Sequence, residues 1–255
     1  MKIAIVNTKG GASKSTTAFQ IASTYMLSKG LNFKHIELDD ENQDAEAFSK
    51  SKIITEQVAV ENGDNLNDTI RNLLLKNENL VIDVGGNKTT TLFLQNLKKT
   101  RMYRLIDLFI IPSSGGSQDI KNAVRTYKTI KEMNPDAKVL FVLSRVRNPN
   151  RVKFQFREFF VNNEIDEKDK QNYIILKDSD VVDLSRILKK SIYEIVEDKN
   201  TKQKLEKEFD KALLDGDNNT IESLSIMLEI IDEAENFFNE YIIPAFQKLD
   251  EILKK

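Results

Sequence analysis

The sequence predicts an α/β fold, a mostly parallel twisted sheet flanked by helices, with a helical extension at the C-terminus. Apolar, β-favouring runs alternate with helix-patterned segments along most of the chain, which is the pattern of βαβ units. A loop with two glycines and two lysines, at residues 9–16, joins the first strand to the first helix. Of the 255 residues, we expect 1–195 to form one large domain and 196–255 a helical extension, packed on that domain or at a dimer interface.

The expected elements follow from short-range patterns. The first strand lies in 3–6, and the helix that follows, 17–27, carries an apolar stripe at i, i+3, i+4 and i+7 spacing. Ser117 is expected to cap a helix that ends before Asn134-Pro135. The other expected strands are 33–38, 80–84, 105–111, 139–143 and 173–176, and the other expected helices are 66–75 and 89–100.

The loop at residues 9–16 has the composition of a phosphate-binding loop. Its glycines allow backbone N–H groups to close around phosphates, and the following helix N-terminus adds a positive partial charge. Lys14 is expected to reach the outer phosphates, and Ser15 to place its hydroxyl on Mg²⁺. The standard pattern has glycine where this sequence has Thr8 and Ser13. Ser13 is expected to disfavour a positive φ angle and to reshape the loop slightly.

The run Asn-Thr-Lys-Gly-Gly-x-x-Lys-Ser-Thr, which begins at Asn7, resembles the deviant Walker A loop of the ParA/MinD family of P-loop ATPases. In appearance the sequence is closest to the plasmid partition ParA proteins. The resemblance covers residues 1–150 by motif and the remainder by position only. It implies ATP and Mg²⁺ as ligands, slow hydrolysis of ATP to ADP and phosphate, and dimerisation on ATP binding. It also implies that Lys9 reaches across the dimer interface to the partner's nucleotide, much as an arginine finger does.

Residues at the carboxyl ends of the expected strands are further candidates, because ligands of open parallel sheets bind there. Asp83 ends a buried strand and suits the Walker B role of holding Mg²⁺. Gly86 can offer its N–H to the γ-phosphate and so sense hydrolysis; the alternative for both residues is a structural turn. By resemblance, Asp39 takes the switch I position that orients the attacking water and approaches Mg²⁺. Asp40 competes with it, and an acidic surface turn is the other interpretation.

Two residues are expected at the base end of the nucleotide. Ser144 stands where the resembled family often has an asparagine that hydrogen-bonds the adenine, and Arg145 can stack on the base or pair elsewhere. The catalytic candidates are therefore Lys9, Lys14 and Asp39, and the metal-ligating candidates are Ser15, Asp39 and Asp83. The nucleotide-binding candidates are Lys9, Gly10, Gly11, Ala12, Ser13, Lys14, Ser15, Thr16, Gly86, Ser144 and Arg145.

Composition excludes several kinds of site. The chain has no cysteine, which excludes disulfides, a thiol nucleophile and the iron–sulfur cluster of the iron-protein reductases that share this loop type. The single histidine, His35, is expected to be structural rather than a metal ligand. No apolar run approaches the length of a membrane span and no signal peptide is evident. We therefore expect a cytoplasmic protein, associated with the nucleoid if it acts in partition, without membrane contact.

The charge is unevenly distributed. Residues 212–247 contain acidic residues but no lysine or arginine, so the rest of the chain is net basic and can favour a polyanion. Two basic groups are candidates for contacting DNA phosphates without sequence preference. The first comprises Lys98, Lys99, Arg101 and Arg104; the second comprises Arg145, Arg147, Arg151, Lys153 and Arg157. Aromatic residues interleave with the second group, at spacings more typical of a buried face than of base stacking.

The C-terminal segment has apolar residues at the three-four spacing of a coiled-coil seam, from Ile221 to Ile252. Additional apolar residues widen this face, and Pro244 is expected to kink the helix. Packing on the protein's own body is the favoured interpretation, and a dimer or partner contact is the alternative. The acidic run argues against a basic amphipathic membrane anchor.

The sequence thus predicts an ATPase switch that partitions plasmid or other DNA together with a centromere-binding partner protein. A conjugation or mobilisation accessory ATPase is one alternative, and a MinD-like positioning ATPase is another.

Overall fold

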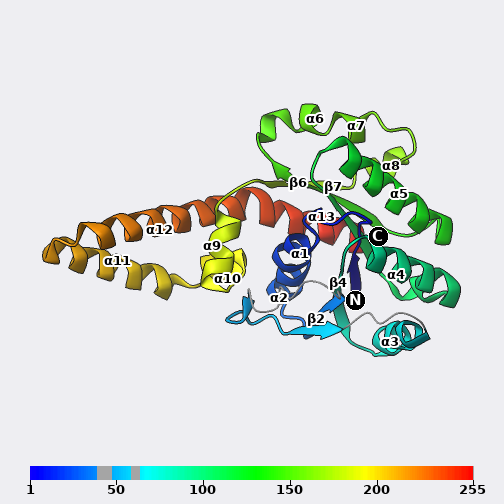
Figure 1. Ribbon diagram of the computed structural model, residues 1–255, viewed down its shortest axis with the longest axis horizontal. Helices are drawn as coiled ribbons and strands as arrows, with labels where there is room; N and C mark the ends of the chain where they lie inside the picture. The colour runs from blue at the N-terminus through cyan, green and yellow to red at the C-terminus, as the bar shows by residue number, and fades with distance from the viewer. Residues whose placement is uncertain (39–47, 59–63, 255) are drawn as a thin grey trace.

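A parallel sheet forms the centre of the molecule (Figure 1). The computed structural model describes residues 1–38, 48–58 and 64–254, and within these residues the sheet has seven strands in the order β3-β2-β4-β1-β5-β6-β7. The strands are β1 (Lys2–Ile5), β2 (Phe33–Leu38), β3 (Thr55–Val58), β4 (Asn79–Val84), β5 (Leu108–Ser113), β6 (Val139–Val146) and β7 (Tyr173–Lys177). The predicted α/β class with a parallel sheet is confirmed.

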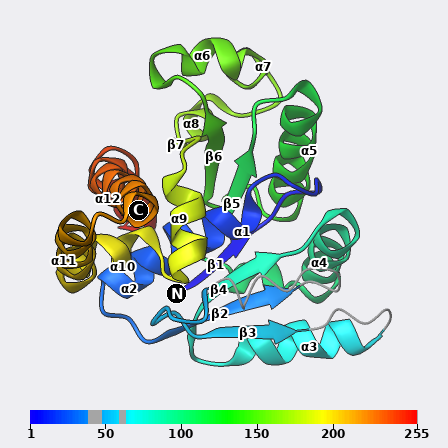
Figure 2. The same cartoon turned by 60° about the vertical axis from the view of Figure 1, so that its left-hand side comes forward.

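Helices cover both faces of the sheet (Figure 2). One face packs against α3 (Asp64–Leu75), α4 (Asn87–Thr100), α5 (Ser117–Met133) and the short helices α6 (Val152–Gln155), α7 (Arg157–Phe160) and α8 (Glu167–Lys170). The other face packs against the helix after the first strand and against α9 (Val181–Leu188), α10 (Ile192–Glu197) and α13 (Ile243–Lys254). Strand residues alternate between the two cores: Ile3 and Ile5 face one, and Ala4 and Val6 the other.

The helix after the first strand is continuous but not α-helical throughout. It begins as α1 (Lys14–Thr17), passes through the π-helical η1 (Ala18–Ser23) and ends as α2 (Thr24–Ser28). Its predicted stripe, Ala18, Ile21, Ala22 and Tyr25, is buried against the sheet. Gly30 follows with a φ of +64°, the left-handed conformation that commonly ends helices.

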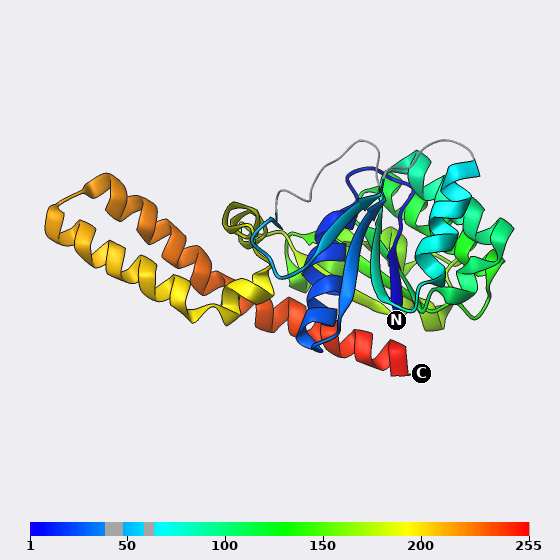
Figure 3. The ribbon, with the colours of Figure 1, turned by 90° about the horizontal axis from the view of Figure 1, so that it is seen from below.

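The C-terminal part forms a long arm. Helices α11 (Lys199–Asp215) and α12 (Asn218–Phe237) pair through a tight turn at Gly216 and extend away from the sheet (Figures 1 and 3). The chain then returns through η5 (Phe238–Ile242) to α13, where Ala245, Leu249 and Ile252 are buried against the body. Pro244 lacks an N–H group, so the carbonyl of Glu240 loses its α-helical partner, and the π-helical η5 lies at this point.

The structure corrects three details of the prediction. Strand β3 was not predicted, and β5 starts at Leu108, because Met102–Leu105 form a 3₁₀ turn, η3. Ser117 is the first residue of α5 rather than its cap: Gly116 takes the cap position, and the Ser117 hydroxyl donates to Glu158. The division at residue 195 stays a prediction. Among the described helices, none combines the length and apolar character that a membrane span needs.

Candidate functional site

A polar cavity of about 360 Å³ lies where β1, β2 and β4 end. The loop after β1 and the start of α1 supply one wall, with Gly10, Gly11, Ser13, Lys14, Ser15 and Thr16. Glu37, Asp83, Gly85 and Gly86 come from the ends of β2 and β4, and Arg145 and Arg186 complete the wall. Ala12 is 1 % exposed and is absent from this described lining. Six of the predicted loop residues therefore meet at one cavity, which we call the phosphate cavity.

The loop turns through two residues with positive φ angles. Gly11 has a φ of +72°, and Ser13, the residue before α1, has φ 62° and ψ 31°. Ser13 adopts the left-handed region although a serine disfavours it, and the expected reshaping of the loop stays a prediction. A non-glycine residue there costs roughly 1–2 kcal/mol.

The two lysines of the loop point to different places. Lys14 is 8 % exposed, lines the phosphate cavity, and its Nζ donates to the carbonyl of Lys9 at 3.1 Å. Lys9 instead forms an ion pair with Asp119 in the first turn of α5. Burial would raise the pKa of Asp119, but hydrogen bonds from Lys9 and Ser114 hold it below its usual value. In this structure Lys9 therefore lies outside its own phosphate cavity.

Two carboxylates meet at the floor of the cavity. Glu37 and Asp83 are register partners in the adjacent parallel strands β2 and β4, and both are largely buried. With the Ser15 hydroxyl in the same wall, they offer the oxygen donors that Mg²⁺ prefers, so the predicted Ser15 and Asp83 fit the ion. Asp39 and Asp40 lie outside the described residues. Glu37 was missed as a candidate ligand, although its register opposite Asp83 was the signal that could have found it.

Gly86 joins the cavity to α4. It occupies the cap position of that helix, lines the phosphate cavity, and has open space where a side chain would be. Thr90, in the first turn of α4, donates its hydroxyl to the carbonyl of Gly85 at 2.7 Å. This fixes the turn after β4 with the Gly86 N–H at the helix N-terminus, where anions bind readily.

A second cavity of about 260 Å³ adjoins the first; we call it the base cavity. Ser144 lines it and donates its hydroxyl to the carbonyl of Ser113 at 3.1 Å. Arg145 follows at an irregularity in the pairing of β6 with β7 and has a φ of +53°. Four residues line both cavities: Ser13, Thr16, Arg145 and Arg186. Ser144 and Arg145 thus share one cavity beside the loop, and their role at the base end of a nucleotide stays a prediction.

The remaining walls of the base cavity come from the C-terminal third of the chain, and sequence reasoning missed them. They include Asp178 and Ser179 after β7, Arg186 of α9 and Phe237 of α12. Gln20, buried in η1, bridges to them: its amide donates to Ser185 Oγ at 3.0 Å and its carbonyl accepts from Ile192 N at 2.9 Å. No local motif marks these residues, because only the fold brings them to the loop.

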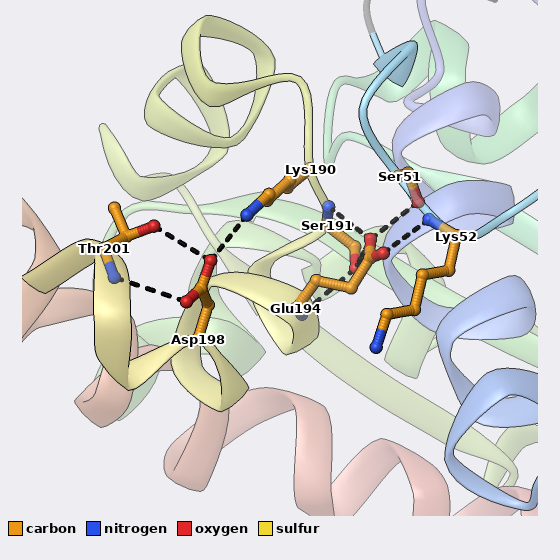
Figure 4. Close-up of polar contacts among 7 residues, drawn as sticks. All are labelled: Ser51, Lys52, Lys190, Ser191, Glu194, Asp198 and Thr201. Carbon is orange, nitrogen blue, oxygen red and sulfur yellow. Dashed lines mark hydrogen bonds and ion pairs between the residues drawn. The ribbon is translucent and has the colours of Figure 1, made fainter.

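The segment that begins at residue 48 is hydrogen-bonded to α10 through Ser51 and Lys52 (Figure 4). Glu194 accepts hydrogen bonds from Ser51 Oγ and Lys52 N, both at 2.6 Å, and completes a capping box with Ser191. Lys190, Asp198 and Thr201 then link α10 to the start of α11. Burial would raise the pKa of Glu194, but these hydrogen bonds hold it below its usual value. Charge-assisted hydrogen bonds therefore hold residues 51–52 to α10 and α10 to the start of α11.

The two basic groups lie at opposite ends of the sheet. Lys98 and Lys99 lie in the last turn of α4, and Arg101 and Arg104 follow it before the start of β5. Arg145 lies in β6, and Arg147, Arg151, Lys153 and Arg157 follow that strand, at the end of the sheet that holds the phosphate cavity. Among the interleaved aromatic residues, Phe156 and Phe159 are buried as expected, whereas Phe154 is 72 % exposed.

Comparison with known proteins identifies one family and a shared fold. The family model described as "ATPase MipZ" matches residues 1–134. A plasmid partition protein of Borrelia burgdorferi B31 bound to AMPPNP is 15% identical with a TM-score of 0.51, covering 73% of this chain and 88% of its own. A chain of the MinC:MinD cell division protein complex of Aquifex aeolicus is 15% identical with a TM-score of 0.50, covering 94% of this chain and 96% of its own. A search of curated protein sequences found no match.

Proposed function

The chain belongs to the MipZ family of ATPases, and from this premise we propose that it is an ATP-dependent nucleotide switch in DNA partition. It dimerises on binding ATP with Mg²⁺, hydrolyses ATP slowly, and moves or spaces plasmid or other DNA together with a centromere-binding partner protein. The helical extension at 196–255 is a separate unit in this proposal, packed on the ATPase domain or at the dimer interface.

The placement of the two lysines carries the proposal. One loop holds Lys14 inside the phosphate cavity and Lys9 outside it, paired with Asp119. A cation on the outer side of the loop would reach a second molecule that docks at this end of the sheet by exchanging its contact with Asp119 for the partner's phosphates. Lys9 would then stabilise the charge that develops on the partner's nucleotide, the role of an arginine finger supplied in trans.

The other site residues suit phosphoryl transfer to water, which needs positioning and charge stabilisation. The loop N–H groups from Gly10 to Thr16 surround the phosphates, and Lys14 neutralises the outer ones. Ser15 and Asp83, with Glu37 beside them, would hold Mg²⁺, and the ion would supply positive charge to offset that of the phosphates. We assign Asp39 to the orientation of the attacking water, and Ser144 and Arg145 to the base end.

The test compares the two lysines in single variants. Lys9→Ala should still bind ATP but fail to dimerise, with turnover reduced about 100-fold, as expected when a transition-state cation is removed. Lys14→Ala should lose ATP binding itself. Calorimetry with a non-hydrolysable ATP analogue measures binding, light scattering after size exclusion measures dimerisation, and phosphate release measures turnover.

An exposed lysine outside both cavities and outside the helical extension serves as the control, for example Lys76→Ala just after α3. A wild-type chain that stays monomeric with ATP and Mg²⁺ would contradict the proposal. Turnover of Lys9→Ala at the wild-type rate would contradict it as well.

The DNA cargo and the localisation to the nucleoid are the finer parts of the proposal. The basic group formed by Lys98, Lys99, Arg101 and Arg104 supports non-specific binding of duplex DNA, since such binding requires only cations at phosphate spacing. Its position at the other end of the sheet from the phosphate cavity leaves the proposed dimer edge free.

A further inference from the structure

A third cavity, of about 510 Å³, lies beside the loop that precedes α5. Three arginines line it, Arg147, Arg151 and Arg157, together with the aromatic ring of Phe154. The remaining wall residues are Ser114, Gly115, Gly116, Asn148 and Gln155. None of these described wall residues is acidic, and none belongs to the phosphate cavity or the base cavity. We call this cavity the arginine pocket.

The frame of the arginine pocket is held by specific contacts. Gln155 accepts from Arg147 N at 3.0 Å and donates to the carbonyl of Arg145 at 2.8 Å, which fastens α6 to the end of β6. Asn148 caps the turn before α6 by accepting from Asn150 N. Beneath the pocket, Phe156 is fully buried, and a Cβ on Gly115 would come within 3.1 Å of its ring. The position of the arginines is therefore set by the fold.

The charge of the pocket is not neutralised from within. Across the described residues, neither Arg147, Arg151 nor Arg157 takes part in an ion pair. Two acids lie next to wall residues: Asp119, beside Gly116, is engaged by Lys9 and Ser114, and Glu158, which follows Arg157, accepts a hydrogen bond from Ser117. Three exposed guanidinium groups around one hollow form a site for an anion, and guanidinium is suited to phosphate.

The aromatic residue adds a second kind of contact. Phe154 is 72 % exposed although its neighbours Phe156 and Phe159 are buried, and Arg157 lies over its ring at 5.8 Å. An isolated exposed phenylalanine needs no explanation, but this one forms a wall of the cationic hollow. An exposed ring with an arginine on it, in the wall of a cationic hollow, offers a stacking surface for a flat, unpaired base.

The α5 N-terminus strengthens the same side of the pocket. Gly116 occupies its cap position without a side-chain hydrogen bond to the first turn, and α5 has 17 residues. Its first-turn N–H groups therefore add positive partial charge next to the arginines.

The geometry points to single-stranded nucleic acid as the ligand of the arginine pocket, with a base stacked on Phe154 and the adjoining phosphates on Arg147 and Arg151. Duplex DNA fits less well, because its bases are stacked on one another and cannot cover the Phe154 ring. This inference is independent of the partition proposal, since neither nucleotide cavity contributes to the pocket. It concerns unpaired strands rather than the duplex cargo.

The test uses the full-length protein without ATP and a fluorescein-labelled oligothymidylate of about 16 nucleotides, within the range of common single-strand site sizes. Fluorescence anisotropy should show binding that weakens about tenfold in Phe154→Ala, the loss expected for one stacked base. Arg147→Gln and Arg151→Gln should each reduce the slope of log affinity against log salt by about 0.7. Because all three residues are on the surface, these variants should fold normally.

Val161→Ala is the matched control, because Val161 is also 72 % exposed but lies outside the arginine pocket. It should bind the oligonucleotide as the wild type does. The inference is overturned if Phe154→Ala binds as tightly as the wild type or if the salt slopes do not change. It is also overturned if a duplex of equal length binds at least as tightly as the single strand. Finally, it is overturned if free thymidine monophosphate competes as well as unlabelled oligothymidylate at an equal concentration of nucleotides. A chain that fails to dimerise with ATP but passes this test would refute only the partition proposal.

Discussion

The phosphate cavity and the base cavity share four wall residues but are built in different ways. The walls of the phosphate cavity come mainly from a contiguous loop and from the ends of β2 and β4, which are adjacent in the sheet. The base cavity draws on β6, β7, α9, α10 and α12, which are far from the loop in sequence. The difference indicates that residues close together in the sequence or in adjacent strands define the phosphate cavity, whereas the base cavity depends on tertiary packing of the C-terminal third.

The largest expected effect is on the stability of the core near the phosphate cavity, where His35 is buried. His35 of β2 is buried against η1, with its Nδ1 2.8 Å from Ser23 Oγ, and burial lowers its pKa from 6.5 to about 4. The unfolded chain takes up a proton on this ring below about pH 6.5, whereas the folded chain does so only near pH 4. The unfolded state therefore binds more protons between these values, and acid destabilises the fold.

We expect the free energy of unfolding to fall by about 2 kcal/mol from pH 7.5 to pH 5 on account of this group. Urea unfolding at the two pH values measures the change. His35→Gln, which keeps a polar side chain but cannot be protonated, should remove most of the difference. Because His35 is the single histidine of the sequence, an equal pH dependence in the variant would show that another group is responsible.

The next prediction concerns Arg186, which lies at the boundary between the two cavities. Arg186 lines both of them. In the proposed binding mode it would therefore lie against the part of a nucleotide that joins the base to the phosphates, which ATP and ADP have in common. Arg186→Ala should weaken both nucleotides equally, by about tenfold, as expected for a lost charge-assisted contact. Calorimetric titration with ADP and with a non-hydrolysable ATP analogue measures this.

Arg104→Ala is the control for this variant, because Arg104 is exposed and lies outside both cavities. A loss confined to the ATP analogue would place Arg186 at the γ-phosphate instead and would contradict the division of the site into two ends.

The same contrast explains how much the sequence could predict. Lys14, Ser15, Asp83 and Gly86 could be brought together as candidates from the sequence, because strand, turn and helix signals place them within a few residues of a strand end, and all four line the phosphate cavity. Arg186 carries no such signal, because in the sequence it resembles many other arginines. Only the packing of α9 beside η1 brings it to the two cavities. The exposed Phe154 was equally hidden, since its spacing from Phe156 and Phe159 is compatible with a buried face. Local patterns thus predicted the fold class and most residues that line the phosphate cavity, whereas most of the wall of the base cavity could be found only from tertiary packing.

The smallest effect concerns Ser13, which lines both cavities in a left-handed conformation. Ser13→Gly removes a backbone cost of roughly 1–2 kcal/mol but adds roughly 0.5–1 kcal/mol of chain entropy to be lost on folding. We expect a net gain of about 0.5 kcal/mol in the free energy of unfolding, measured with urea. Ala12→Gly has no positive φ angle to relieve and should lose about 0.5 kcal/mol or more. If both glycine variants lost the same stability, serine at position 13 would carry no net backbone strain. The contacts of the Ser13 side chain would then offset the cost of its left-handed conformation.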